Sequence, residues 1–253
     1  MLCTFARTFA RTFALALTLT LALALTLALA EAQIVLDNSN FNTCINEYIL
    51  NYPMFPELYN TTGCNGVLPS SWDTSGVTNM NYAFRNRGTF NEDLSSWNTS
   101  GVVSMMQMFK GATNFNGDVS TWDVSNVRTM SSMFHDATNF NQDLQNWNVG
   151  SVTSMSSMFR STSSSSGNIF NQDISSWNVG KVVYFNYMFK YSPTFNQPIG
   201  SWDVGAASYM GELFAGTGAF DQDLSDWATR SNVPSTNTNM FAYANGLSDA
   251  NKC

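Results

Sequence analysis

Seven tryptophans recur along this chain at an almost constant interval, and this spacing constrains the fold more than any other feature of the sequence. They are Trp72, Trp97, Trp122, Trp147, Trp177, Trp202 and Trp227. Neighbouring tryptophans are 25 residues apart, except for one interval of 30 residues that contains an insertion at 163–167. A fixed period of this length is typical of tandem-repeat proteins, in which each unit packs against its neighbours.

Apolar residues hold the same positions in each unit. They occur 2, 5, 8, 11, 12 and 18 residues after the Trp, and again three residues before the next Trp. In the unit of Trp122 they are Val124, Val127, Met130, Met133, Phe134, Phe140 and Leu144. One unit cannot bury so many apolar side chains alone, so we expect the stacked units to share one core of Trp, Met and Phe.

The spacing of these apolar residues changes within each unit. Trp147 and Val149 lie two residues apart, which is typical of one face of a strand. Val127, Met130 and Phe134 are separated by three and four residues, which is typical of a short helix. The sequence therefore predicts an α/β solenoid of about seven 25-residue coils, each with a short strand at its Trp and a short helix or helical turn after it. In the Phe-Asn-x-Asp segments that follow, we expect Asn and Asp to bond backbone groups that the ladder leaves unpaired.

Residues 1–32 are predicted to be a secretory signal peptide. Arg7 and Arg11 precede an Ala/Leu/Thr run over 13–30 that ends in small residues. An uncleaved anchor is the alternative, because about 20 apolar residues can cross a bilayer. We expect a secreted or surface protein with no membrane span after signal removal. The rest of the chain divides into an N-terminal cap (33–71), the repeat solenoid (72–230), and an irregular last coil with a C-terminal cap (231–253).

The cysteines suit an oxidising compartment. Cys44 and Cys64 flank a Tyr/Pro-rich stretch of the N-terminal cap, and a disulfide between them is expected to stabilise the cap by about 3 kcal/mol. Cys253 would lie on the order of 30 Å away if the coils stack at the spacing of neighbouring strands, too far for a disulfide. A free thiol, an intermolecular link and a chain that continues in a longer form are the three open interpretations of Cys253.

The charge balance excludes several functions. Eleven Lys and Arg against 18 Asp and Glu give a net charge of −7, which argues against a phosphate-binding surface and therefore against nucleic acid as a partner. The sequence contains no nucleophile elbow, phosphate-binding loop or paired-carboxylate motif. We therefore expect no enzymatic activity and no cofactor.

Three residue types suggest metals but have simpler interpretations. Methionines such as Met130 and Met133 lie at helical spacing beside Phe, so we expect core packing instead of a soft-metal site. A column of aspartates suggests calcium along one edge, although Pro198 interrupts it and turn capping explains each Asp singly. These aspartates are Asp93, Asp118, Asp143, Asp173 and Asp223. His135, the single histidine, lies at an outward position of the predicted helix and is expected at the surface, and no second His or Cys lies at ligand spacing for a metal.

The residue after each Trp is the best candidate for ligand binding, because it points outward from the predicted strand. These residues are Asp73, Asn98, Asp123, Asn148, Asn178 and Asp203, and we call them the post-Trp column. Such a polar, mildly acidic face suits a basic protein segment or a glycan, and plain solvation is the competing interpretation. Asn60 and Asn98 begin N-glycosylation sequons, which are meaningful in a eukaryotic host.

The units resemble a known family. The pattern W-D-V-S-x-V-x-x-M-S-x-M-F-x-x-A-x-x-F-N-x-D-L-S over residues 72 to 244 is similar to the BspA-like leucine-rich repeat of secreted and surface proteins. Leu94, Trp97 and Thr99 occupy the strand positions of such a repeat, with Trp in place of the usual Leu. The resemblance implies a leucine-rich-repeat-like solenoid outside the cell, in a family associated with adhesion and with binding of proteins or matrix.

Together these observations predict a non-catalytic recognition module that binds extracellular protein or matrix through the strand-bearing face. One alternative is a structural matrix or cell-wall component that self-associates through exposed edges or through Cys253. Another is a binder of glycan or of an ordered surface, for which the regular spacing of the coils is suggestive.

Overall fold

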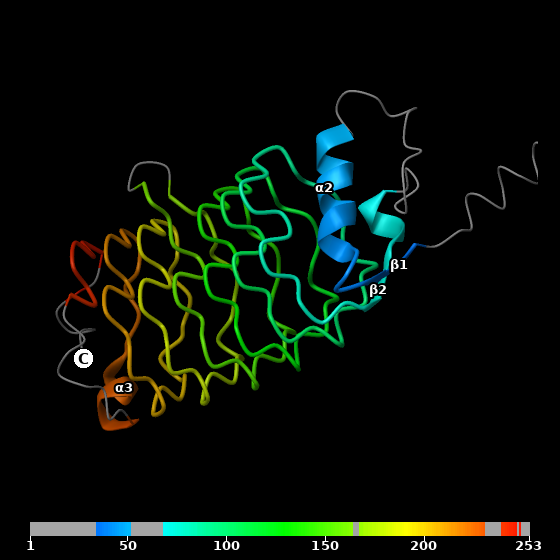
Figure 1. The fold of residues 1–253 in the computed structure, drawn as a ribbon. Helices are drawn as coiled ribbons and strands as arrows, with labels where there is room; N and C mark the ends of the chain where they lie inside the picture. The colour runs from blue at the N-terminus through cyan, green and yellow to red at the C-terminus, as the bar shows by residue number, and fades with distance from the viewer. Residues whose placement is uncertain (1–33, 52–67, 164–166, 231–238, 247, 249–253) are drawn as a thin grey trace, which may run out of the picture. The chain divides into compact units, whose positions relative to one another are not determined.

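The computed structural model describes residues 34–51, 68–163, 167–230, 239–246 and 248. Its helices and strands are β1 (Val35–Asp37), α2 (Phe41–Asn51), the 3-10 helix η1 (Pro69–Ser71), β2 (Asp73–Gly76) and α3 (Ser225–Arg230). The chain divides into two compact units, Met1–Ile34 and Val35–Cys253. All five elements belong to the second unit, and Figure 1 shows its successive coils side by side between β2 and α3.

The second unit begins with a short cap over the first tryptophans. β1 pairs in parallel with β2, with Val35 opposite Asp73 and an irregular register before Asp37. α2 places two aromatic rings against the core: the ring of Phe41 lies 5.6 Å from that of Trp97, and the ring of Tyr48 lies 6.2 Å from that of Trp72. Both contacts are edge-to-face, an arrangement that aromatic pairs favour.

The tryptophans form one buried column, as the sequence predicts. Adjacent indole centroids are 6.1–6.5 Å apart and nearly parallel, and the seven side chains are 1–4% exposed. Two columns of Phe run beside them; Phe109 and Phe134 of adjacent coils are 5.6 Å apart, and Phe134 and Phe140 within one coil are 3.8 Å apart. The predicted inward positions are confirmed, since every apolar residue named for the Trp122 unit has no exposed surface.

Parallel bridges connect each coil to the next, and they lie seven residues after each Trp instead of at the Trp. The bridging residues, which we call the intercoil ladder, are Asn79, Ser104, Thr129, Ser154, Tyr184 and Tyr209. Around the Trp the polar groups bond differently: the hydroxyl of Thr99 donates to the backbone carbonyl of Asp123, 2.9 Å away. The expected strand at the Trp is present in the first coil, where β2 follows Trp72, whereas the isolated bridges between the later described coils lie seven residues after the Trp.

The expected helix after the Trp is replaced by a series of tight turns. Gln107 and Ser132, ten residues after their tryptophans, have φ values of 56° and 55°, which a right-handed helix excludes. Alternate amides bond to the next coil, as in Gln107 to Ser131 (2.9 Å) and Phe109 to Met133 (2.9 Å). The intervening amide of Met108 bonds to Met105 within its own coil. Neighbouring coils thus provide acceptors that an α-helix would provide internally.

Asparagine side chains complete the stacking at the far side of each coil, as expected for the Phe-Asn-x-Asp segments. The amide of Asn116 donates to Asn91 Oδ1 at 2.7 Å, and that of Asn141 donates to Asn116 Oδ1 at 2.9 Å. Gln142 adds a bond from its side-chain nitrogen to the Asn116 carbonyl, 2.6 Å away.

Within the described ranges, no helix combines the length and the apolar character that crossing a membrane requires.

Candidate functional site

The post-Trp column is present on successive coils, and five of its six members are exposed, with Asp73 partly buried. Hydroxyls of the residues next to its first members connect neighbouring coils. Thr74 Oγ1 donates to the backbone carbonyl of Asn98, and Thr99 Oγ1 donates to the backbone carbonyl of Asp123, both at 2.9 Å. The structure therefore brings the predicted residues into one row. Their side chains, however, are engaged within their own coils.

Each post-Trp side chain accepts a hydrogen bond from the backbone amide two residues later. Asp123 Oδ1 accepts from Ser125 at 2.9 Å, and Asn98 Oδ1 accepts from the amide and hydroxyl of Ser100 at 3.1 and 2.7 Å. The side-chain and backbone bonds from Ser125 lower the pKa of Asp123. Such Asx turns give these residues a structural role that needs no ligand.

The second aspartate column also caps turns. Asp93 Oδ1 accepts the amide of Ser95 at 2.8 Å, and Asp173 Oδ1 accepts that of Ser175 at 2.9 Å. The backbone bond, followed by the serine side chain, lowers the pKa of both carboxyl groups. Among the residues that the structure describes, no three His, Cys, Asp or Glu side chains gather where they could hold a metal ion.

Two exposed tyrosines mark the intercoil ladder. Its first four members are Asn, Ser or Thr, whereas the last two are Tyr184 and Tyr209. Their rings stack with centroids 4.8 Å apart and planes at 10°, and the residues are 43% and 53% exposed. Adjacent exposed aromatic rings on an otherwise polar row are typical of binding surfaces, where Tyr provides contact area and a hydroxyl.

A column of basic residues lies thirteen positions after the Trp in five successive coils. We call it the cationic column: Arg85, Lys110, His135, Arg160 and Lys190. Backbone bonds keep its members in register, since the carbonyl of His135 accepts the amide of Gly111 at 2.7 Å and the carbonyl of Arg160 accepts that of Asp136 at 2.9 Å. The basic side chains therefore leave the backbone from equivalent places on adjacent coils.

Tyrosine rings accompany the cationic column. The guanidinium of Arg160 lies 5.3 Å from the ring centroid of Tyr187, and the ammonium of Lys190 lies 5.4 Å from the same ring and 5.2 Å from that of Tyr191. Distances below about 6 Å allow a cation–π attraction. Lys190 also pairs with Glu212, so one position of the column is neutralised within the protein.

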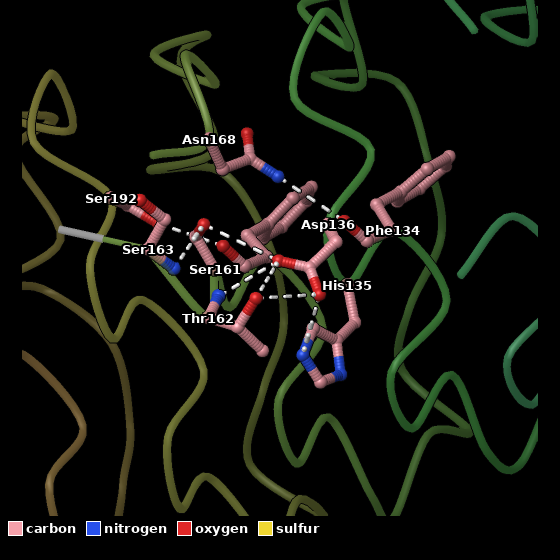
Figure 2. Close-up of polar contacts among 9 residues, drawn as sticks. Phe134, His135, Asp136, Ser161, Thr162, Ser163, Asn168 and Ser192 are labelled. Carbon is pink, nitrogen blue, oxygen red and sulfur yellow. Dashed lines mark hydrogen bonds and ion pairs between the residues drawn. The ribbon is translucent and has the colours of Figure 1, made fainter. Parts of the chain in front are cut away.

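His135 is buried, contrary to the expected surface position. The residue is 5% exposed, whereas its neighbours in the column, Lys110 and Arg160, are only partly buried. Its Nε2 lies 3.4 Å from Asp136 Oδ2, as Figure 2 shows. Burial lowers the pKa of His135 to about 4. The charge of Asp136 raises this pKa, and the charges of Lys110 and Arg160 lower it further. The ring is therefore neutral at physiological pH.

Asp136 also connects the column to the start of the insertion at 163–167. Its Oδ1 accepts the amide of Thr162 at 2.7 Å, and the hydroxyl of Ser161 lies 3.3 Å from the same oxygen (Figure 2). Beyond the insertion, the side-chain nitrogen of Asn168 donates to the Phe134 carbonyl at 3.2 Å. These bonds fix both ends of the inserted segment to the coil that carries His135.

Other predicted site residues stand as follows. Cys44 is disulfide-bonded, but Cys64 lies outside the described residues, so the pairing stays a prediction. Asn60 and Cys253 also lie outside them, as does the signal peptide. Asn98 is exposed. The cationic column and the ladder tyrosines were not predicted as site residues, although aligning the units on their tryptophans displays both.

Stacked units with one shared core define a tandem-repeat protein. The family described as Mycoplasma protein of unknown function, DUF285, matches residues 53–169 and 165–252, which together cover more than half of the chain. The chain therefore belongs to this family. No curated protein and no solved structure matches it.

Proposed function

We propose that this chain is a repeat solenoid that acts outside the cell as a non-catalytic recognition module, binding extracellular protein or matrix through the face of the intercoil ladder. The observation that carries the proposal is the exposed stack of Tyr184 and Tyr209, 4.8 Å apart. Neither ring is needed to form the coil, because the same position holds Ser104 and Ser154 elsewhere. Exposed aromatic rings without a structural role favour a binding function.

Two sequence features support the extracellular setting. Residues 1–32 have the composition of a secretory signal peptide, and the repeats resemble the BspA-like leucine-rich repeats of secreted and surface proteins. In that family adhesion and binding of proteins or matrix are common. The ladder face takes precedence over the post-Trp column in this proposal, because the post-Trp side chains already accept bonds within their own coils.

The test compares the two faces directly. The mature protein is applied to an array of immobilised collagen, gelatin and neutral polysaccharides, together with two double variants. Tyr184→Ser with Tyr209→Ser installs the residue that other coils carry at this position. Asp123→Lys with Asp203→Lys alters the post-Trp column.

We expect the tyrosine variant to lose binding by about tenfold or more, as for removal of aromatic residues at the centre of an interface. The lysine variant is expected to bind like the wild type. Unchanged binding of the tyrosine variant would overturn the ladder face as the binding site. Loss of binding in the lysine variant alone would identify the post-Trp column as the binding site instead. Light scattering that shows oligomers of the mature protein would favour a self-associating structural component instead.

A further inference from the structure

The cationic column concentrates positive charge in an acidic chain. The structure describes seven Lys and Arg side chains, of which Arg85, Lys110, Arg160 and Lys190 belong to the column. The net charge of the whole chain is −7, so this strip is opposite in sign to the chain as a whole. Within the described residues, Lys190 is the one Lys or Arg of the column with an ion pair. Arg85, Lys110 and Arg160 therefore retain charge that a ligand can use.

The middle of the column also holds polar groups without hydrogen-bond partners. Arg160 Nε and His135 Nδ1 are buried and unpaired in the described part of the chain, and so is Gln107 Oε1. His135 is 5% exposed, and its other ring nitrogen has only the 3.4 Å contact to Asp136. Buried polar groups of native proteins are normally paired, and exceptions often belong to functional sites. This second observation places the centre of a site at the coils of Lys110, His135 and Arg160.

The regular repetition of the column favours a ligand that is itself a repeating polymer. Arg85, Lys110 and Arg160 occupy equivalent positions on coils in hydrogen-bonded register, with the buried His135 between the last two, so each of these three coils offers one weak contact. Several weak contacts along one polymer combine into a much stronger interaction. A ligand with a single anionic group would use only one of these positions.

The tyrosine rings favour an acidic polysaccharide over an acidic polypeptide as the ligand. The guanidinium of Arg85 lies 5.6 Å from the ring centroid of Tyr82, and Tyr187 and Tyr191 flank Lys190, so aromatic rings stand beside the cations near both ends of the strip. Sugar rings present apolar faces that stack on aromatic side chains, while their acidic groups pair with Arg and Lys. An acidic polypeptide has the charges but no such rings. The aspartates at the exposed turns of other positions repel a polyanion and so favour this strip over the rest of the coil surface.

We infer that the cationic column binds a linear acidic polysaccharide that runs from coil to coil, with its carboxylate or sulfate groups on Arg85, Lys110 and Arg160. The inference goes beyond the proposed function, because the cationic column lies thirteen residues after each Trp instead of seven and is a second site with its own ligand class. Protein–ligand ion pairs form along the strip, and sugar rings lie against Tyr82, Tyr187 and Tyr191.

The experiment measures binding of the mature protein to polygalacturonate and chondroitin sulfate by biolayer interferometry at low and high salt. Dextran, polyglutamate and duplex DNA are the comparison polymers. The column variant is Lys110→Ala with Arg160→Ala, because the sixth coil carries Ala215 at the same position. The matched control, Arg128→Ala with Lys181→Ala, removes the same charge from exposed residues outside the column. Lys110→Glu is a second column variant in case the double variant unfolds.

We expect the wild type to bind both acidic polysaccharides and to lose affinity steeply with salt, as polyanion complexes do. The column variants are expected to lose about tenfold or more in affinity, and the control less than about twofold. Equal losses in column and control variants would overturn the inference, since binding would then follow net charge alone. Polyglutamate or DNA binding as tight as polygalacturonate binding would also overturn it.

One further result separates this inference from the proposed function. Absence of binding to either acidic polysaccharide, with retained and Tyr184-dependent binding on the matrix array, would overturn the inference and leave the recognition function standing. Polysaccharide binding that depends on Lys110 and Arg160 but not on Tyr184 would uphold the inference, and the matrix array alone would then decide whether the ladder tyrosines form the other site.

Discussion

The indole nitrogen of Trp122 donates a hydrogen bond to the backbone carbonyl of Leu94, 2.9 Å away in the preceding coil. Trp147 bonds to Val119 in the same way at 3.0 Å. The ring of Trp122 also stacks on that of Trp97, with centroids 6.1 Å apart. Each indole thus fills the core and satisfies a buried carbonyl, which explains why the position is Trp throughout, where Leu or Phe would provide apolar volume alone.

This double role predicts an unequal response to shortening the ring. We expect Trp122→Phe to lower the free energy of unfolding by about 2–4 kcal/mol, because lost packing adds to an unpaired carbonyl at Leu94. Trp227→Phe should lower it less, because Trp227 stacks on a single tryptophan, Trp202. Urea unfolding followed by circular dichroism measures both variants. Equal losses at the two positions would contradict the shared column as the main source of stability.

The turns that replace the expected helix lead to a second prediction. Ser132 has a φ of 55°, in the left-handed region that β-branched residues strongly disfavour. We expect Ser132→Val to destabilise the protein by about 1–2 kcal/mol and Ser132→Gly to be nearly neutral. Thermal unfolding of the two variants compares them directly. A stable Val variant would instead support the helical turn that the apolar spacing indicates.

The sequence predicted the core well because burial depends on the repeat period alone. Trp122, Met130 and Phe134 recur in register, and any regular winding of the chain places them inside. Local structure was predicted less well. Steps of three and four residues, as from Val127 to Met130 and Phe134, fit a helix and a series of tight turns equally.

The candidate site illustrates a different limit. Asp123 points outward as predicted, but its bond to Ser125 depends on a turn that periodicity does not reveal. His135 was expected at the surface because it occupies an outward position of the predicted helix. Its burial arises only when the coils stack, because the backbone at His135 bonds to Gly111 in one neighbouring coil and the adjacent Asp136 bonds to Arg160 in the other.

The Asx turns predict a loss of stability in acid. Hydrogen bonds lower the pKa of Asp93, Asp123 and Asp173 from the ordinary value of 3.8, so the folded chain binds fewer protons than the unfolded chain. Their stabilising contribution is complete above that value and is lost as pH falls through the lowered ones. Replacing all three by Asn keeps an acceptor oxygen, as Asn98 shows at a post-Trp position. We expect this variant to lose less Tm than the wild type between about pH 5 and pH 2. Parallel curves would exclude these carboxylates as the cause.

His135 predicts a separate window at higher pH. Its pKa falls from 6.5 in its ordinary state to about 4 in the folded chain, so the unfolded chain binds the extra proton between these values. The contribution of the neutral His135 to stability is fully present above pH 6.5. It declines as the pH falls from there towards 4, because protonation of the histidine in the unfolded chain favours unfolding. His135→Gln removes the titrating group while keeping a polar side chain, and its Tm should change little across this window. Thermal unfolding of both proteins at half-unit pH steps tests this, with the three-Asn variant as the control that retains the histidine. If the wild type and His135→Gln decline together above pH 4, the buried ring is not the titrating group.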